Sequence, residues 1–363
     1  MKLSQIGELF LLEEIRKSFK KKSKHVVVGI GDDAAVVRPQ DKYLLFTTDM
    51  MIEGVHFDSS FITPYQLGFK IVSVNVSDIY AMGGKPFYLL LNIAMNKNTN
   101  KKFIDRLFDG TKDAIRLYDT TLIGGDLSAS NKGMFLSATV IGYGEKYIKR
   151  SGANRGDKIY VTGSLGDSAC GLELLKKIRK PIPLECMKQY KIRNTPSLTL
   201  PPRGGGKGWG GAFDLRTLNA ELSALRLSWK IIEPLIRRHL LPEARNPKNF
   251  IQDATSMIDI SDGLLIDLSR LCNESKVGAR IYINNIPLSP ELKKAASSPG
   301  ISPIKLALSG GEDYELLFTA PPEKKVKAIY IGEITKSERV IVDSSGKEKQ
   351  FSAEGYQHFI DKK

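Results

Sequence analysis

Short apolar runs rich in β-branched and aromatic residues alternate along the chain with longer segments of helical periodicity. The expected strands cover residues 26–29, 44–48, 87–94, 134–142, 158–163, 257–260, 280–283, 315–319, 328–331 and 340–342. Helical segments lie between them. This alternation predicts an α/β or α+β fold of mixed sheets flanked by helices.

Capping signals place the clearest helices. One is expected over residues 63–84, because a Thr-Pro pair opens it and a Gly-Gly pair follows its end. Asp78 falls in its last turns and is expected to face away from Asn75 and Ser77. A second helix is expected over 101–117. A third begins at Leu264, directly after an acidic loop, so its dipole is expected to face an anion site.

The chain is long enough for two domains, with 363 residues of which 42% are hydrophobic. The polar stretch KYIKRSGANRGDK predicts a boundary near residue 150, giving domains over 1–149 and 150–363. The stretch at about 194–229 is interpreted as an insertion with a marginal helix over 215–227, since its Pro/Gly-rich first part offers few apolar anchors. A glycine-rich functional loop is the alternative.

Acidic residues recur in short loops punctuated by glycine or serine. They are Asp32 and Asp33 in GIGDDAAV, Asp49 in TTDMM, Asp78 in NVSDIYAMGG, Asp126 in IGGDLS, Asp167 in GSLGDS, Asp259 and Asp262 in IDISDGLL, and Glu312 and Asp313 in SGGEDYELL. Carboxylates beside exposed backbone amides can hold a polyphosphate through Mg²⁺, and no cluster of Cys and His suggests Zn²⁺. A Mg²⁺-dependent phosphotransferase is predicted. Ordinary turns would explain any single loop but not the whole set.

The net charge and the cysteine content indicate where in the cell the protein works and which kinds of partner it binds. A net charge of +14 raises nucleic-acid binding as an alternative, but the basic run at 16–24 is interpreted as the solvated end of a helix over 3–19, without aromatic residues for base stacking. The three cysteines form no CxxC motif, which favours a reducing cytoplasm. Neither a secretory signal nor a membrane span is expected. The predicted protein is cytoplasmic, with no nucleic-acid or membrane partner.

Two glycine-rich stretches imitate nucleotide-binding motifs and are rejected. Residues 29–34 satisfy the dinucleotide fingerprint, yet Pro39 and a new strand follow where a helix is required. In PPRGGGKGWGG, Pro201 replaces the first glycine of the P-loop and Gly208 replaces its Mg²⁺-binding hydroxyl residue.

The ordered motifs resemble the thiamine-monophosphate kinase family of the aminoimidazole-ribonucleotide-synthetase-like superfamily. They are GIGDDAA, TTDMMIEGVHF, NVSDIYAMGGKP, LIGGD, IKRSG, VTGSLGDSACGL, IDISDGL, LSGGEDYELLF and GYQHF. The resemblance implies a two-domain fold of that superfamily and ATP-dependent phosphorylation of thiamine monophosphate to thiamine diphosphate with several Mg²⁺ ions. It also implies a homodimer whose N-terminal, ATP- and Mg²⁺-binding domains pair through their sheets.

Carried over position by position, the resemblance implies three groups of site residues. The Mg²⁺ ligands would be Asp33, Thr47, Thr48, Asp49, Asp78, Asp126, Asp259 and Asp262. ATP would meet Gly125, Asp126, Arg150 and Ser261, and the acceptor would meet His56, Glu312 and Tyr356. A structural histidine and a tyrosine that only anchors the tail are the alternatives for His56 and Tyr356. Asp32, Asp167 and Asp313 are expected to cap loops or to support the ligands.

The implied chemistry requires neither a covalent nucleophile nor a general base, because the acceptor phosphate is mostly dianionic at neutral pH. Other superfamily activities are weaker alternatives. A selenophosphate synthetase would require an N-terminal catalytic Cys or selenocysteine, but no Cys precedes Cys170. A hydrogenase-maturation relative would end with a functional Cys, whereas this chain ends HFIDKK. An aminoimidazole ribonucleotide synthetase, or a nucleotide-binding protein without catalysis, stays open.

Overall fold

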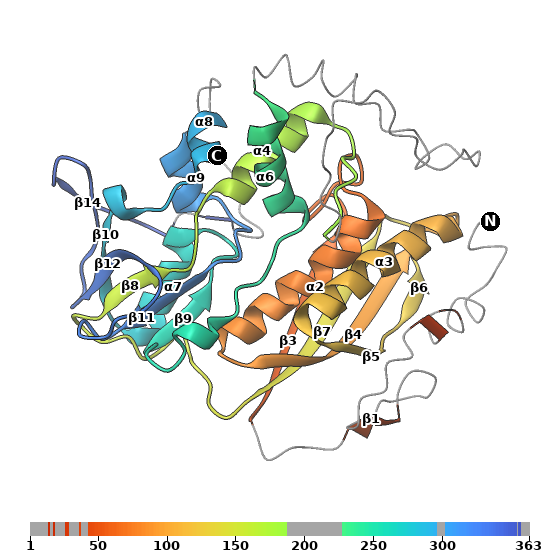
Figure 1. Ribbon diagram of the computed structural model, residues 1–363, viewed down its shortest axis with the longest axis horizontal. Coiled ribbons are helices and arrows are strands. Elements are labelled where there is room, and N and C mark those ends of the chain that lie inside the picture. The colour runs from red at the N-terminus through yellow and green to blue at the C-terminus, as the bar shows by residue number, and fades with distance from the viewer. Residues whose placement is uncertain are drawn as a thin grey trace.

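The computed structural model describes residues 14, 17–18, 26–28, 36–37, 43–186, 227–295, 302–353 and 355–356. Two large β-sheets occupy the two ends of the molecule, with helices packed on and between them (Figure 1). Strands between residues 43 and 144 form the first sheet, and strands from Lys158 onward form the second. The predicted mixed sheets flanked by helices are confirmed.

The first sheet has five strands in the order β3-β7-β4-β5, and β6 also pairs with β4. β3 and β4 run antiparallel to β7, whereas β5 and β6 run parallel to β4. The period-two burial of β7 shows why this segment is a strand with one covered face. The strands are β3 (Tyr43–Ile52), β4 (Lys85–Met95), β5 (Thr121–Gly124), β6 (Leu127–Ala129) and β7 (Phe135–Gly144), and β1 (Val26–Val28) pairs separately with β2 (Val36–Val37).

Two long helices pack together against this sheet. α2 (Pro64–Ala81) begins after Thr63, whose side chain and that of Gln66 form a reciprocal capping box, which confirms the predicted start. α3 (Lys101–Tyr118) confirms the second predicted helix. The two backbones approach closely at Gly68, where an added Cβ would lie 1.9 Å from the Leu107 carbonyl oxygen. Glycine is therefore required at this crossing.

The second sheet has seven strands in the order β14-β13-β10-β12-β8-β11-β9. Its strands are β8 (Lys158–Val161), β9 (Ser256–Asp259), β10 (Gly278–Tyr282), β11 (Leu316–Ala320), β12 (Ile329–Thr335), β13 (Arg339–Val342) and β14 (Glu348–Gln350). The accompanying helices are α4 (Asp167–Ile178), α6 (Trp229–Leu240), η1 (Pro247–Asn249), α7 (Leu264–Ser275), η2 (Ile283–Asn285), α8 (Pro290–Ala295) and α9 (Pro303–Ser309).

The two parts of the molecule share a continuous apolar core. Buried side chains of α4 and α6, including Leu174 and Leu235, belong to the same cluster as Phe69 of α2 and Leu107 of α3. α2 therefore lies between its own sheet and the helices of the C-terminal half (Figure 1). The chain crosses from one sheet to the other between Gly144 and Lys158, and the division into domains at residue 150 stays a prediction.

Some expectations require correction or lie outside the described residues. β2, β5, β6 and β14 were not expected, because short strands carry little periodic signal. The predicted insertion lies outside the described residues up to position 226, but Leu227 is buried and Ser228 directly precedes α6. Its last three positions therefore belong to the packed fold. The predicted helices over 3–19 and 215–227 fall almost entirely outside the described part. None of the described helices is long and apolar enough to cross a membrane.

Candidate functional site

Several predicted site residues meet where the C-terminal end of α2 lies against β3 and β9. Asp78, in the last turn of α2, accepts a hydrogen bond of 2.5 Å from the Thr47 hydroxyl of β3. Ser77 donates a hydrogen bond of 2.6 Å to Asp259 at the end of β9. One helix end thus joins loops from both halves of the chain.

Four carboxylates crowd this junction, and we call Asp49, Asp78, Asp259 and Asp262 the junction carboxylates. Burial, followed by the charges of Asp78 and Asp262, raises the pKa of Asp49 to about 6, although the residue keeps contact with solvent. Burial and the charge of Asp78 raise the pKa of Asp259 well above its usual range. Burial also raises the pKa of Asp78, against the opposing effects of the Thr47 hydroxyl and Arg150. Such mutual repulsion is what a bound cation relieves.

The donor chemistry of this junction fits Mg²⁺, because every side chain in it offers hard oxygen. Among the described residues, however, no three Asp, Glu, His or Cys side chains converge tightly enough to make a finished metal site. Mg²⁺ is commonly held by one or two carboxylates together with substrate phosphates and water. The junction carboxylates match that pattern, and the predicted ligand Asp33 lies outside the described residues.

The orientation expected for Asp78 is wrong. Asn75, Ser77 and Asp78 all contribute to the junction, since the Asn75 side chain accepts a hydrogen bond of 2.9 Å from the backbone N–H of Asp49. α2 has neighbours on nearly all sides, so its polar residues turn toward protein groups and not toward solvent. Asn75 thereby binds an amide on the edge strand β3.

Thr48 and Asp126 lie apart from the junction carboxylates. The Thr48 hydroxyl donates to the Ala138 carbonyl at 3.0 Å, on the opposite face of β3 from Thr47 and Asp49, as strand alternation requires. Asp126 follows Gly125 at the end of β5, and β7 and β4 lie between β5 and β3 in the sheet. With neighbouring strands roughly 4.8 Å apart, β5 is about 14 Å from β3. A single ion therefore cannot bind both Asp49 and Asp126 in this conformation.

Gly125 lies close to the neighbouring strand β4. Its φ of 152° and its contact with the Leu91 backbone exclude a larger residue, because an added Cβ would lie 1.8 Å from the Leu91 carbonyl oxygen. The glycine is therefore required by the close packing of this turn on β4, and its contact with ATP stays a prediction.

The start of α7 is occupied by an internal carboxylate. Asp267 is completely buried and accepts hydrogen bonds of 3.1–3.2 Å from the backbone N–H groups of Ser261, Asp262 and Gly263. These amides were expected to face an anion site, but Asp267 already provides their anion. The Ser261 hydroxyl remains the candidate phosphate contact in this loop.

A hollow of about 350 Å³ opens beside this loop, between α7 and the C-terminal segment. It is lined by Asp262, Ile266, Ser269, Arg270, Asn273, Ala353 and Tyr356. The Tyr356 backbone N–H donates to the Asp262 carbonyl at 3.0 Å, and Arg270 pairs with the Asp262 carboxylate at 2.7 Å. Tyr356 is thus held beside one junction carboxylate, where an aromatic ligand could reach it.

Arg150 and His56 occupy different surroundings. Arg150 is exposed, yet its charge reaches Asp78 and partly opposes the rise in the pKa of that carboxyl caused by burial. Its carbonyl accepts a 2.9 Å hydrogen bond from Ser275, which fixes the segment between β7 and β8 against α7. His56 Nδ1 accepts from the Ile52 backbone N–H at 3.1 Å, within the turn that follows β3. This contact orients the ring within that turn.

Glu312 has partners that the sequence did not identify. Its carboxylate lies 3.0 Å from Lys70 Nζ of α2 and 3.0 Å from His239 Nδ1 of α6. Glu312 and Tyr314 adopt the positive φ angles of 65° and 50°, which non-glycine residues rarely do. Lys70 and His239 belong to no motif, and only the burial of polar side chains reveals them.

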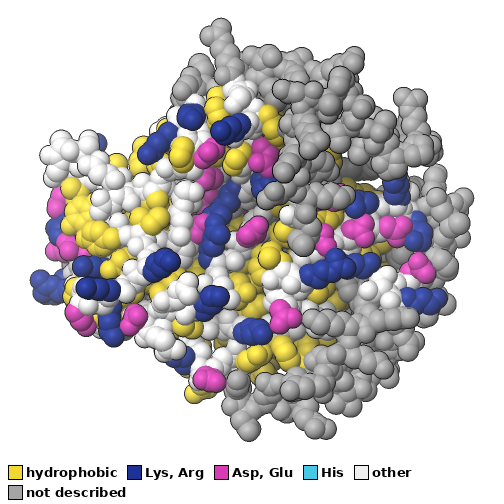
Figure 2. Space-filling view, viewed as in Figure 1, with side chains coloured by type: hydrophobic (Ala, Val, Ile, Leu, Met, Phe, Trp, Pro, Cys, Tyr) yellow, Lys and Arg dark blue, Asp and Glu magenta, His cyan; other side chains and the backbone are white. Residues whose placement is uncertain are grey.

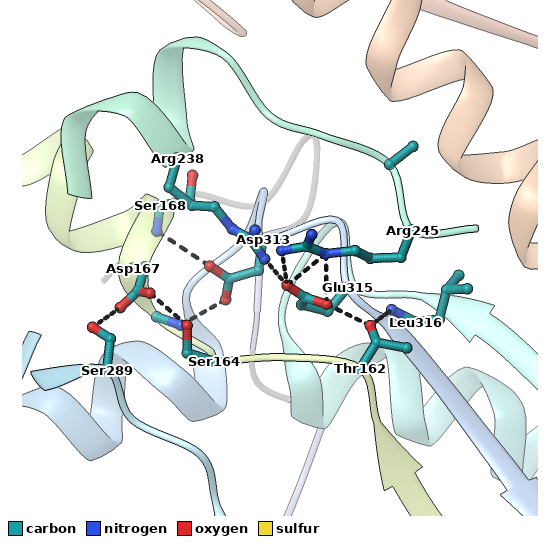
Figure 3. Close-up of polar contacts among 12 residues, drawn as sticks. Thr162, Ser164, Asp167, Ser168, Arg238, Arg245, Ser289, Asp313, Glu315 and Leu316 are labelled. Carbon is teal, nitrogen blue, oxygen red and sulfur yellow. Dashed lines mark hydrogen bonds and ion pairs between the residues drawn. The ribbon is translucent and has the colours of Figure 1, made fainter. Parts of the chain in front are cut away.

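A second buried network supports the same loop (Figure 3). Glu315, directly before β11, binds Arg238, Arg245 and Thr162. Asp313 accepts from the backbone N–H groups of Gly166 and Ser168, which is the loop-capping role predicted for it. These contacts tie the segments around α4, α6, β8 and β11 together.

Asp167 lies in the same network, as the first residue of α4. Its carboxylate accepts hydrogen bonds of 2.6 Å from both Ser164 and Ser289. It therefore binds neighbouring loops and not the junction carboxylates.

The surface gives little support to the nucleic-acid alternative. On the face shown in Figure 2, Lys and Arg side chains of the described residues are interspersed with Asp and Glu and form no single basic patch. Polyanion binding generally uses such a patch.

Comparisons with known proteins agree on one family. The model of the AIR synthase related protein N-terminal domain matches residues 31–143, and that of the C-terminal domain matches 208–344, starting inside the predicted insertion. Thiamine-monophosphate kinase of Aquifex aeolicus is 35% identical over 364 residues, covering 99% of this chain and 100% of that protein. The same enzyme of Buchnera aphidicola from Acyrthosiphon pisum is 36% identical and covers 96% and 98%. A structure of AaThiL complexed with AMPPCP and TMP aligns with a TM-score of 0.70 at 33% identity, covering 99% of each chain.

Proposed function

This chain belongs to the AIR synthase related family and, within it, to the thiamine-monophosphate kinases, and we propose that its junction carboxylates are the centre at which it uses ATP to phosphorylate thiamine monophosphate. The product is thiamine diphosphate. The observation that carries the proposal is the meeting of Asp49, Asp78, Asp259 and Asp262, from elements of both halves, with raised pKa values among them.

Mg²⁺ is the proposed metal. Asp49, Asp78, Asp259 and Asp262, with the Thr47 hydroxyl, would hold several Mg²⁺ ions, one or two carboxylates to each ion, while Asp126 would serve a separate ion or phosphate across the sheet. When bound, Mg²⁺ neutralises the phosphate charge that would otherwise keep ATP and an anionic acceptor apart. We retain Asp33 as a further ligand on sequence grounds.

Direct in-line transfer is the proposed reaction course. On sequence grounds the backbone at Gly125 would contact the ATP phosphates, and Arg150 and Ser261 would donate hydrogen bonds to them. The acceptor is already a phosphate monoester and mostly dianionic, so no general base is needed. Glu312 and Tyr356 would bind the thiamine part of the acceptor, and His56 is retained as a third acceptor contact on sequence grounds.

A homodimer is proposed from the outer face of β3. Leu44, Phe46 and Met50 alternate along this edge strand and are 45%, 66% and 53% exposed. Large apolar side chains in a row on an exposed sheet mark a surface for a partner, here a second copy of the chain. A cytoplasmic location is proposed as well, since Cys170, Cys186 and Cys272 are all free thiols.

Product analysis with a set of acceptors tests the proposed function. The purified full chain, ATP and Mg²⁺ are incubated with thiamine monophosphate, with thiamine, or with the ribonucleotide precursor of aminoimidazole ribonucleotide. Thiamine diphosphate should form from thiamine monophosphate alone. Turnover of only the ribonucleotide precursor would transfer the assignment to an aminoimidazole ribonucleotide synthetase.

A further inference from the structure

Lys70 is a charged side chain inside the protein. It lies in the middle of α2, is 1% exposed, and places Nζ 3.0 Å from Glu312 Oε2. A buried ammonium is stable only when it is paired, because burial removes its hydration. Since α2 belongs to the N-terminal half and Glu312 precedes β11, this ion pair joins the two halves of the chain.

His239 approaches the same oxygen of Glu312. Its Nδ1 lies 3.0 Å from Oε2, and the ring is buried in α6. Burial and the charge of Lys70 lower the pKa of His239, so the ring is neutral near pH 7 and can donate one N–H to the carboxylate. Ser168 Oγ, 3.2 Å from Nδ1, fixes the ring further.

The second oxygen of Glu312 is left for another partner. Within the part of the chain that the structure describes, both close donors contact Oε2, and the side chain keeps 28% of its surface exposed. Burial opposes ionisation, but Lys70 and His239 outweigh it and lower the pKa of Glu312 to about 2. The carboxylate is therefore ionised, held at one oxygen and open at the other.

The backbone of Glu312 is fixed as firmly as its side chain. Its N–H donates to the Ser261 carbonyl at 2.7 Å, which places the residue beside the proposed ATP loop. Its positive φ is maintained by the buried neighbours Asp313 and Glu315, whose side chains bind other elements. A carboxylate restrained in this way acts at a set distance and direction.

We propose that Lys70 is a positioning residue for the acceptor: with His239, it holds one oxygen of Glu312 so that the other oxygen binds the thiamine part of thiamine monophosphate. The inference rests on the proposed role of Glu312 in acceptor binding. It adds that Lys70, which touches no substrate, sets the KM for the acceptor. Because Lys70 already balances part of the Glu312 charge, the open oxygen acts as a directed hydrogen-bond acceptor more than as an isolated counter-ion.

A purely structural ion pair is the competing explanation. Ser77 and Asp259 also join the halves, so a connection alone could account for Lys70. The two explanations differ kinetically. Loss of a structural connection would affect ATP and acceptor alike, whereas loss of positioning would affect the acceptor alone.

Kinetics of three variants test the proposal: Lys70→Met, Glu312→Gln, and the two combined. Each single change should raise the KM for thiamine monophosphate about tenfold or more and alter that for ATP less than about twofold. The double variant should be no worse than Glu312→Gln alone, because Lys70 acts only through Glu312. Lys324→Met is the matched control, since Lys324 is 49% exposed and pairs with Asp253 at 3.1 Å.

Three results would overturn the proposal. They are an unchanged acceptor KM in folded Lys70→Met, equal increases for both substrates, and effects that multiply in the double variant. If Lys70→Met does not fold, the double variant decides, because it leaves no unpaired buried charge; a wild-type acceptor KM there would refute the role of the pair. A wild-type protein that forms no thiamine diphosphate would contradict the proposed function itself.

Discussion

Asp49 shows how a single residue can connect folding and function through electrostatics. Its pKa of about 6 means that the ionised form is disfavoured by burial and by Asp78 and Asp262. The folded, metal-free protein therefore tolerates this charge at neutral pH at a cost in stability. A bound cation would convert the same charge into a favourable interaction.

Replacing Asp49 should consequently separate activity from stability. We expect Asp49→Asn to lose about a hundredfold or more in kcat/KM, because the amide weakens the metal and misplaces the phosphates that depend on it. In EDTA the variant should unfold at a temperature no lower than wild type, because one repelling charge is gone. Asp105→Asn, on the exposed face of α3, is the control. Near-normal turnover of folded Asp49→Asn at low Mg²⁺ would exclude Asp49 as a ligand.

Asp313 should make stability depend on pH. Burial, against the opposing effects of Arg238 and two backbone amides, raises the pKa of Asp313 to about 7. The folded state thus binds this proton more tightly than the unfolded chain, so the stabilising contribution is complete below about pH 4 and is lost as the pH rises through 7. Asp313→Asn keeps an acceptor oxygen but cannot ionise. Its free energy of unfolding in urea should fall less steeply than that of wild type between pH 5 and 7.5; parallel curves would contradict this assignment.

At the scale of elements, α2 is the part that organises the site. Polar residues recur along it at helical spacing, and Gln66, Lys70 and Ser77 each bind a group in the C-terminal half. A second surface of α2 packs against α3, where glycines allow the two helix backbones to approach closely. The position of the junction carboxylates depends on both surfaces of α2, the polar one and the one that contacts α3.

Gly68→Ala tests the second of these surfaces. Alanine gains about 1 kcal/mol of helix propensity over glycine, but overpacking against the Leu107 carbonyl should cost about 3 kcal/mol. A net loss of about 2 kcal/mol in the free energy of unfolding is expected. Leu117→Ala, at an exposed position of α3, should change stability by less than about 0.5 kcal/mol. Equal stability of Gly68→Ala and wild type would mean that the helices can separate freely.

The sequence predicts elements better than it predicts their surroundings. Thr63 and the following proline predict the start of α2 because capping is local. The stripe formed by Gln66, Lys70 and Ser77 resembles a solvent-facing surface, and only the tertiary fold shows it to be buried. Motif order brings Asp78 and Asp259 into one site, but the distance of Asp126 follows from strand order, with β7 and β4 between β3 and β5. The opposite orientations of Thr47 and Thr48 were available from strand alternation.

At the scale of the whole molecule, two sheets, the helices between them and a shared core hold loops from both halves together. On the described surface, the outer face of β3 is the strongest candidate for a protein interface, since the apolar side chain of Phe46 is 66% exposed.

Phe46→Glu should therefore change the oligomeric state. A charge in the centre of the exposed β3 row would have to be buried at the proposed dimer interface, which is unfavourable without a partner. Light scattering coupled to size-exclusion chromatography should find a dimer for wild type and a monomer for the variant. Leu117→Glu, exposed on α3, should remain dimeric. A wild-type monomer at micromolar concentration would contradict the interface.

A single-turnover experiment with ATP labelled in its γ-phosphate tests the central claim most directly. The full chain, Mg²⁺ and thiamine monophosphate are mixed with the labelled ATP, and protein and products are separated at short times. Direct transfer at the junction carboxylates predicts that the label appears in the terminal phosphate of thiamine diphosphate and never on the protein. Label bound covalently to the chain, or released only as inorganic phosphate without thiamine diphosphate, would contradict the account.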